Sequence, residues 1–150
     1  SWSFGMWKAD GTGRDKELFL LLSDDGQSGT VIESGLQFTV DHDYFVAFAF
    51  DGDSSADDLT FYMQDLNGGS LQSATVSSGF TTLFDSAADI MIGGYQDDSV
   101  SGWTGSIDEV RFSDTTLGSD DLLVIPEPWS AGLVLLGALV LRRAAMRRRR

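Results

Sequence analysis

The residues of this chain that could carry chemistry are mostly carboxylates, and their densest group lies at residues 51–58. This stretch has the sequence DGDSSADD, with four aspartates among small residues. Calcium prefers about six to eight oxygen ligands, and acidic loops of this kind often supply them. The order departs from the EF-hand loop, because Ser55 and Ala56 stand where that loop has its third acid and its glycine. Acidic runs mostly face solvent, so a solvated loop between two strands is the favoured interpretation.

The single histidine, His42, is the obvious candidate for triad or acid–base chemistry. The chain has no cysteine, and no Ser or Asp in an elbow-like motif accompanies the histidine. Asp41 and Asp43 flank His42 in a turn-like stretch, where exposed loop acids are the usual finding. We therefore predict that the chain is not an enzyme.

Three tryptophans are candidates for stacking on sugar rings: Trp2, Trp7 and Trp103. Aromatic side chains in β-sandwiches are more often part of the core, so burial is the favoured interpretation and stacking the alternative.

The last residues of the chain have three parts in a fixed order. Pro126, Glu127 and Pro128 come first, and the uncharged run 129–141 follows. The chain then ends in an arginine cluster made of Arg142, Arg143, Arg147, Arg148, Arg149 and Arg150. Such a cluster resists crossing a bilayer, so it is expected to stay in the cytoplasm while the upstream residues lie outside. A transmembrane segment at 129–146 is predicted, with Arg142 and Arg143 snorkelling to the interface.

This order of motif, apolar run and basic end resembles the PEP-CTERM sorting signal of Gram-negative bacteria. The resemblance implies export, transient membrane anchoring at the cell envelope, and recognition by an exosortase that cleaves near the motif. An ordinary C-terminal membrane anchor is the alternative. The apolar run has about 13 residues, whereas a comfortable spanning helix needs roughly 20. This shortness favours a processed signal.

The charges of the chain are divided between two unlike parts. Of 23 acidic and 10 basic residues, 22 acids and 4 bases precede Pro126. This body therefore carries about −18, and the tail about +5. An acidic body repels nucleic acid, so no nucleic-acid partner is expected. Without cysteine the body has no disulfides and depends on its core or on bound metal.

The start of the chain suggests that more sequence precedes it. Ser1 is not a methionine, and no basic and then apolar secretion signal precedes Trp2. We expect the chain to be the C-terminal part of a longer precursor.

The body is predicted to be all-β. Strand-like runs occur at residues 3–7, 16–23, 30–32, 36–40, 44–50, 59–64, 71–76, 90–92 and 106–112. Short strands separated by Gly and Asp turns favour an antiparallel sandwich of two sheets. One helical turn is expected at 115–123, with Ser119 as its cap.

Several of these runs resemble a LamG-like, concanavalin-type jelly roll. The late motifs are DIMIGG at 89–94, WTGSIDEVRF at 103–112 and TLGSDDL at 116–122, and the earlier ones are YFVAFAFDG at 44–52 and LTFYMQD at 59–65. The resemblance covers a domain at 1–123. This domain lacks the family's opening strands and has a longer turn at 65–68. The predicted tail with its transmembrane helix follows at 124–150. It implies two curved antiparallel sheets, a concave face that often binds glycans or proteins, and sometimes a structural calcium.

The same resemblance bears on site residues. Hydrolases on this jelly roll carry E-x-D-x-E or E-x-D-x-x-E on one strand, and this sequence has neither. In calcium-containing relatives the Asp that matches Asp108 supplies a carboxylate, so Asp108 is the candidate calcium ligand. Strand alternation would point Asp108 to the convex side and Ile107 into the core.

The function expected from the sequence is a non-catalytic glycan- or protein-binding module of an exported surface or extracellular-matrix protein. Two alternatives stay open: an accessory binding module of a larger polysaccharide-degrading enzyme, and a structural matrix protein without a discrete ligand.

Overall fold

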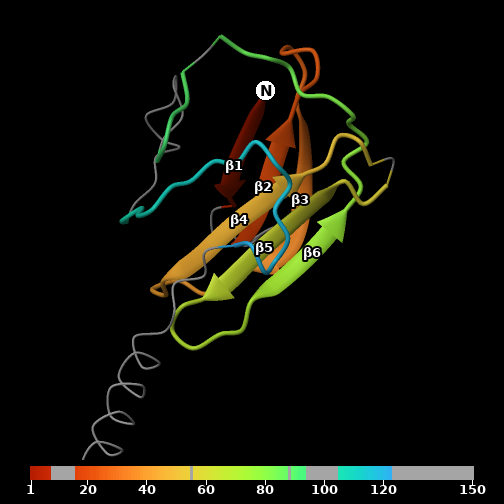
Figure 1. Ribbon diagram of the computed structural model, residues 1–150. Coiled ribbons are helices and arrows are strands. Elements are labelled where there is room, and N and C mark those ends of the chain that lie inside the picture. The colour runs from red at the N-terminus through yellow and green to blue at the C-terminus, as the bar shows by residue number, and fades with distance from the viewer. Residues whose placement is uncertain (8–15, 55, 88, 94–104, 123–150) are drawn as a thin grey trace, which may run out of the picture.

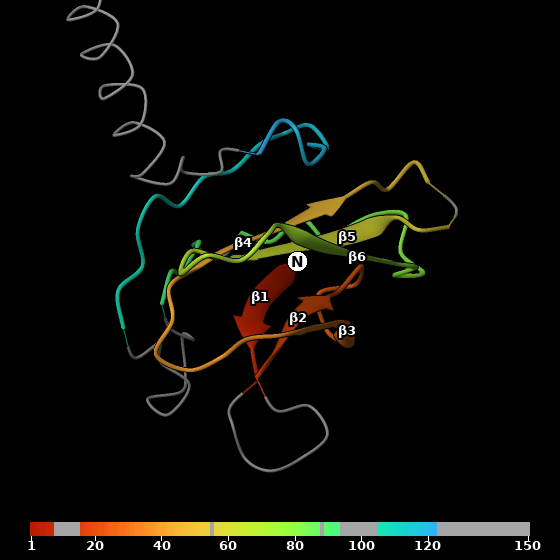
Figure 2. The same ribbon diagram turned by 90° about the horizontal axis from the view of Figure 1, so that it is seen from below.

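The protein, seen in a computed structural model, forms two antiparallel sheets that lie face to face (Figures 1 and 2). The structure describes residues 1–7, 16–54, 56–87, 89–93 and 105–122. The strands in these ranges are β1 (Trp2–Met6), β2 (Glu17–Leu22), β3 (Thr30–Gln37), β4 (Tyr44–Phe50), β5 (Leu59–Asp65) and β6 (Gln72–Val76). One sheet has the order β1-β2-β3 and the other β4-β5-β6. The prediction of an all-β protein with two antiparallel sheets is confirmed, and the arrangement is consistent with a jelly roll.

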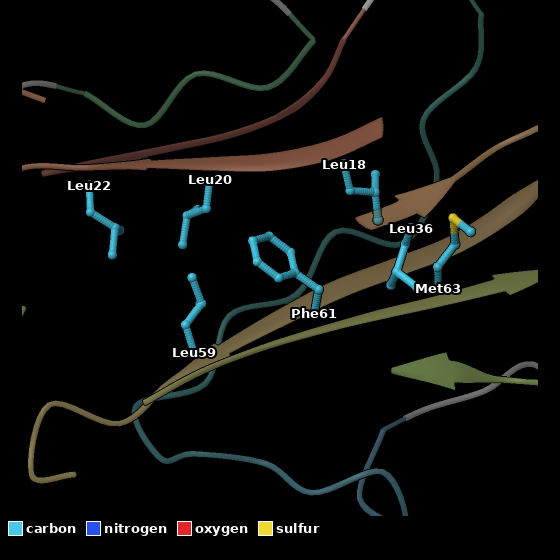
Figure 3. Packing of buried hydrophobic residues seen from close by; sticks show 7 residues of the cluster. All are labelled: Leu18, Leu20, Leu22, Leu36, Leu59, Phe61 and Met63. Atoms are coloured by element: carbon cyan, nitrogen blue, oxygen red, sulfur yellow. The ribbon is translucent and has the colours of Figure 1, made fainter. Parts of the chain in front are cut away.

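The core lies between the two middle strands. β2 and β5 both have a hydrogen-bonded neighbour on each side, and alternate residues of each strand turn toward the facing sheet. The residues that meet there are Leu18, Leu20, Leu22, Leu36, Leu59, Phe61 and Met63 (Figure 3). Full burial of one such side chain stabilises the fold by about 1.5–3 kcal/mol. The sandwich is therefore held mainly by β2 packing on β5.

β3 corrects one prediction, because residues 30–32 and 36–40 do not form two separate strands. They share one strand that ends at Gln37 and has an irregular register opposite β2, between the pairs Glu17–Gln37 and Phe19–Glu33. Gly35 sits in this bulge with φ of 73°, and its N–H donates to the carboxylate of Glu17. The predicted break at Gly35 is therefore a β-bulge, which a glycine accommodates without steric cost.

Three other predicted elements are wrong. Residues 90–92 and 106–112 form no strand, and residues 115–122 form no helix. Phe112 is 60% exposed, and Ile107 is 46% exposed rather than buried in the core. A strand exists through hydrogen bonds to a neighbour, and these stretches form no ladder with a described strand. The expected helical turn is a simple turn in which Asp121 N–H donates to Gly118 O at 3.1 Å, and the Ser119 hydroxyl lies 3.5 Å from the Asp120 side chain instead of capping a helix.

Residues 77–87 run from the end of β6 past the β4–β5 loop to the β2–β3 turn (Figure 1). Near the start of this segment, Ser78 N–H donates to the buried Asp58 carboxylate at 2.6 Å, and the Ser78 hydroxyl donates to it as well. At the other end, Phe84 N–H donates to Ser23 O at 2.9 Å. The Phe84 ring also lies against Gly26, where an added Cβ would come within 2.6 Å of the ring. The segment therefore joins the two sheets at one end of the sandwich.

Among the described residues, no helix is long and apolar enough to span a membrane. The predicted transmembrane segment at 129–146, and the whole predicted tail at 124–150, lie outside these residues.

Candidate functional site

The outward face of the β1-β2-β3 sheet carries a stacked aromatic pair. Alternation along β1 sends Phe4 and Met6 to the core, and Ser3, Gly5 and then Trp7 to the outside. Trp7 stacks on Phe19 of β2, with ring centroids 4.3 Å apart and planes 25° from parallel. Neither ring belongs to the core cluster or packs against it. Trp7 therefore lies outside the core cluster although its Nε1 is buried, and we call Trp7 and Phe19 the aromatic platform.

Gly5 is the residue that makes room for this platform. It pairs with Phe19 across the sheet, and a Cβ at Gly5 would lie 2.8 Å from Phe19 Cζ. The Phe19 ring thus rests directly on the β1 backbone, where a side chain would displace it. The backbone of Trp7 is attached to β2, because Trp7 N–H donates to Glu17 O at 2.9 Å. The platform therefore sits on two paired strands rather than on a loop.

The remainder of this face is unusually apolar for the outside of a sandwich. Leu21 and Val31 face each other across β2 and β3 beside the platform, and Val31 is exposed. Gly29 leaves space for the Leu21 side chain, since a Cβ there would meet it at 2.7 Å. Glu33 is the register partner of Phe19 and adds a carboxylate to the same face. Outward sheet faces are normally polar, so this face is a candidate for binding.

Trp2 has a different setting. It is 39% exposed and lies at the side of the sandwich where β1 faces β4, with its ring 5.5 Å from Phe48 and 6.1 Å from Phe112. Trp103, the third stacking candidate, lies outside the described residues.

His42 forms part of a polar corner that sequence reasoning missed. His42 Nδ1 lies 2.7 Å from Asp65 Oδ2, and Asn67 N–H donates to Asp65 Oδ1 at 2.8 Å. The hydrogen bond from His42, followed by that from Asn67, lowers the pKa of Asp65 below its ordinary value. Asp43 N–H donates to the Asn67 side chain at 2.9 Å, which ties the β3–β4 connection to the β5–β6 turn. These contacts give His42 a structural role.

The acidic loop at residues 51–58 connects β4 to β5, as the sequence indicated. Asp51 closes the loop from one side, because its N–H donates to Asp58 O at 2.8 Å and its side chain accepts from Asp53 N–H at 3.1 Å. Within the described ranges, no three His, Asp or Glu side chains gather closely enough to hold a metal.

Asp108 lies on an exposed, extended segment. Its carboxylate accepts a hydrogen bond from Glu109 N–H at 2.8 Å, and Glu109 itself has φ of 49°. No calcium shell is assembled around Asp108 by the carboxylates that the structure describes. Calcium at Asp108 stays a prediction, and so do the roles of Pro126, Glu127, Pro128 and the arginine cluster, which lie outside the described residues.

Comparison with known families gives one match that covers most of the chain. The family model Laminin_G_3, described as the concanavalin A-like lectin/glucanases superfamily, matches residues 1–122. No curated protein and no solved structure matches the chain.

Proposed function

The chain belongs to the concanavalin A-like lectin/glucanase superfamily, and from this membership we propose that residues 1–123 are a non-catalytic module that binds glycans or extracellular proteins. The match over residues 1–122 carries the proposal, because this fold is a general scaffold for binding carbohydrates or proteins. The module serves an exported bacterial surface or extracellular-matrix protein.

The carboxylates support a binding role over hydrolysis. A glycosidase needs two carboxyl groups facing each other across the scissile bond. The hydrolase spacings E-x-D-x-E and E-x-D-x-x-E are absent from the sequence. Among the acids near the sheets, Asp58 is buried and engaged by Ser78, and Asp65 is engaged by His42.

A polysaccharide panel tests this part of the proposal. The full chain, kept soluble in a detergent without a sugar headgroup, is incubated with insoluble and soluble polysaccharides. We expect depletion of the protein onto at least one of them, with no release of reducing ends. Release that is abolished by changing a single Asp or Glu would show catalysis and overturn the proposal.

The C-terminal sequence supports export and sorting. Pro126, Glu127 and Pro128 precede the apolar run 129–141 and the terminal arginines, in the order of an exosortase sorting signal. The acidic body and basic tail also fit a protein whose body lies outside the cell and whose last residues enter the cytoplasm. Exosortase and the membrane are the partners proposed for this tail.

Mass spectrometry of the mature protein tests the sorting step. In a host that carries an exosortase, we expect the arginine cluster to be missing from the surface form. A matched variant with Pro126→Ala and Pro128→Ala should keep Arg150, because it retains the apolar run and the charges but not the motif. Intact Arg150 on the mature wild-type protein would leave only a simple membrane anchor.

A further inference from the structure

We propose that Asn67 and Gly68, in the turn between β5 and β6, form a self-modifying site where the Asn67 side chain loses ammonia and becomes aspartate or isoaspartate. Asn67 is the only asparagine of the chain, and a glycine follows it. The turn lies at the end of the sandwich where β3 connects to β4 (Figure 1). Water is the only other reactant, so the modification does not depend on the proposed binding function.

The reaction is an attack by the backbone on the preceding side chain. The Gly68 nitrogen bonds to Asn67 Cγ, the bond from Cγ to Nδ2 breaks, and ammonia leaves with the proton of the Gly68 N–H. Water then opens the cyclic imide at either of its carbonyl groups. Opening at the side-chain carbonyl gives aspartate, and opening at the backbone carbonyl gives isoaspartate. Adjacent reacting groups favour this ring closure, and glycine adds no side chain that would hinder it.

The first argument is access to the attacking nitrogen. Asn67 and Gly68 are both exposed, so water and hydroxide can reach them. The N–H groups on either side of Gly68 are engaged, because those of Asn67 and Gly69 both donate to Asp65. The Gly68 N–H donates to no acceptor in the part of the chain that the structure describes. The nucleophile is therefore free while its neighbours hold the turn.

The second argument is the polarised carbonyl of Asn67. Asp43 N–H donates to Asn67 Oδ1 at 2.9 Å. Negative charge gathers on this oxygen as the nitrogen attacks Cγ, and an N–H already directed at the oxygen stabilises that charge. The donor itself has a fixed position, because Leu66 N–H donates to Asp43 O at 2.8 Å. The hydrogen bond therefore favours the attack.

The third argument is a comparison with another glycine turn of the same chain. Asp25 and Gly26, between β2 and β3, have a similar local sequence. There the Gly26 N–H is engaged, since it donates to Ser23 Oγ at 2.9 Å. Asp25 also carries a carboxyl group, which is a poorer electrophile than an amide when ionised and has no ammonia to lose. The structure therefore favours reaction at Asn67 over reaction at Asp25.

Modification would loosen the polar corner. Asn67 accepts from Asp43 N–H through its side chain and donates to Asp65 through its backbone. Isoaspartate adds a carbon atom to the main chain between these two contacts, and either product adds a negative charge beside Asp65. The link between the β3–β4 connection and the β5–β6 turn therefore weakens in older molecules. Because ammonia is lost, the change is not reversed.

The experiment follows the full chain at neutral and mildly alkaline pH, in water enriched in oxygen-18. We expect peptide mass spectrometry to show conversion of the Asn67 amide to an acid that carries the heavy oxygen, which excludes conversion during later digestion. Conversion should be faster at alkaline pH, because hydroxide removes the Gly68 proton. An isoaspartyl methyltransferase, used as a reagent, should label the Asn67 peptide and not the Asp25 peptide.

Asn67→Gln is the matched variant, because it keeps a side-chain amide but must close a larger ring with another rotatable bond. Its conversion should be roughly 10-fold slower or more. The wild type provides a second measurement in case this variant does not fold. Conversion of the folded wild type should run within roughly 10-fold of that in guanidinium, since the folded turn leaves the attacking nitrogen free.

The outcomes decide each step of the proposal. Aspartate without isoaspartate would show direct hydrolysis and overturn the imide route. Conversion in guanidinium alone would show that the fold protects Asn67, so the arguments from access and polarisation would both be wrong. Hydrogen exchange at Asp43 and Leu66 should be faster in the isoaspartate fraction, and equal exchange would overturn the loosening of the polar corner. The polysaccharide panel tests the binding function separately from all of these results.

Discussion

The middle strand β5 and the later segment 105–112 contain similar apolar residues in very different surroundings. β5 places Leu59, Phe61 and Met63 in the core, and its backbone pairs with β4 on one side and β6 on the other. The later segment carries Ile107 and Phe112 exposed, and it joins no ladder with a described strand. The difference shows that apolar residues at strand-like spacing do not by themselves make a strand. Hydrogen-bonded neighbours and a facing sheet are also required.

The largest expected effect is on the free energy of unfolding, and it is tested on two phenylalanines, one in each region. Phe61→Ala removes a fully buried ring between the sheets and should lower the free energy of unfolding by about 3–5 kcal/mol. Phe112→Ala removes a ring that is 60% exposed and should change the free energy by no more than about 0.5 kcal/mol. Denaturant unfolding of the full chain measures both. Similar losses in the two variants would mean that segment 105–112 is packed as firmly as β5.

The sequence predicted the strands β4 and β5 well for a physical reason. The run at 44–50 matches β4 at both ends, and 59–64 differs from β5 only by Asp65. These runs are rich in aromatic and β-branched residues and are bounded by acidic and glycine turns, which mark strands locally. The run at 106–112 has similar local features. The missing information was whether another strand would lie beside it.

Other features of the structure could not be predicted because they depend on contacts between residues far apart in the sequence. The partner of His42 is Asp65, 23 positions away, and the partner of the Gly35 N–H is Glu17, 18 positions away. Trp7 was assigned to the core by its residue type. Its outward direction follows from the phase of β1, and its stacking partner Phe19 lies on another strand. Gly5 was one available signal, since a glycine within a strand often marks a close approach by another group.

The calcium hypothesis for Asp108 predicts a second way of stabilising segment 105–112, one that does not need strand pairing. If calcium binds Asp108 in the folded protein only, metal at about 100 times its dissociation constant should add roughly 2.7 kcal/mol of stability. Segment 105–112 would then be held by metal ligation where strand pairing is absent. Thermal melts with calcium and with chelator, on wild type and Asp108→Ala, measure the effect. A wild-type midpoint that is indifferent to calcium excludes the site, and a shift that is lost in Asp108→Ala confirms it.

A smaller effect is expected at the start of β5, where residues 77–87 are attached to the sandwich. Asp58 is buried and accepts hydrogen bonds from the backbone and hydroxyl of Ser78. Asp58→Ala leaves the Ser78 N–H without this acceptor and should cost about 1–3 kcal/mol. Ser78→Ala is the matched control, because it removes the hydroxyl but keeps the backbone donor, so its cost should be lower. Hydrogen exchange of residues 77–87 should rise more in Asp58→Ala than in Ser78→Ala. Equal exchange in both variants and the wild type would show that Asp58 does not hold this segment.

The smallest expected effect is on the pH dependence of stability. It is tested by comparing the polar corner with an exposed ion pair of the later segment. Hydrogen bonds from His42 and then Asn67 lower the pKa of Asp65 in the folded protein. A carboxyl group with a lowered folded pKa stabilises the fold above its unfolded pKa, near 3.9, and this contribution is lost as the pH falls through the folded value. The stability of the wild type should therefore decline more steeply below about pH 5 than that of Asp65→Asn, whose side chain does not titrate.

Glu109→Gln is the control from the later segment, where Glu109 and Arg111 lie 3.4 Å apart and are both exposed. A surface pair of this kind contributes little, so this variant should follow the wild type over the whole range. Parallel pH curves for the wild type and Asp65→Asn would show that the contacts of Asp65 do not stabilise the sandwich. A steeper wild-type curve would mean that this corner, at one end of the paired strands, adds to the stability that their core provides.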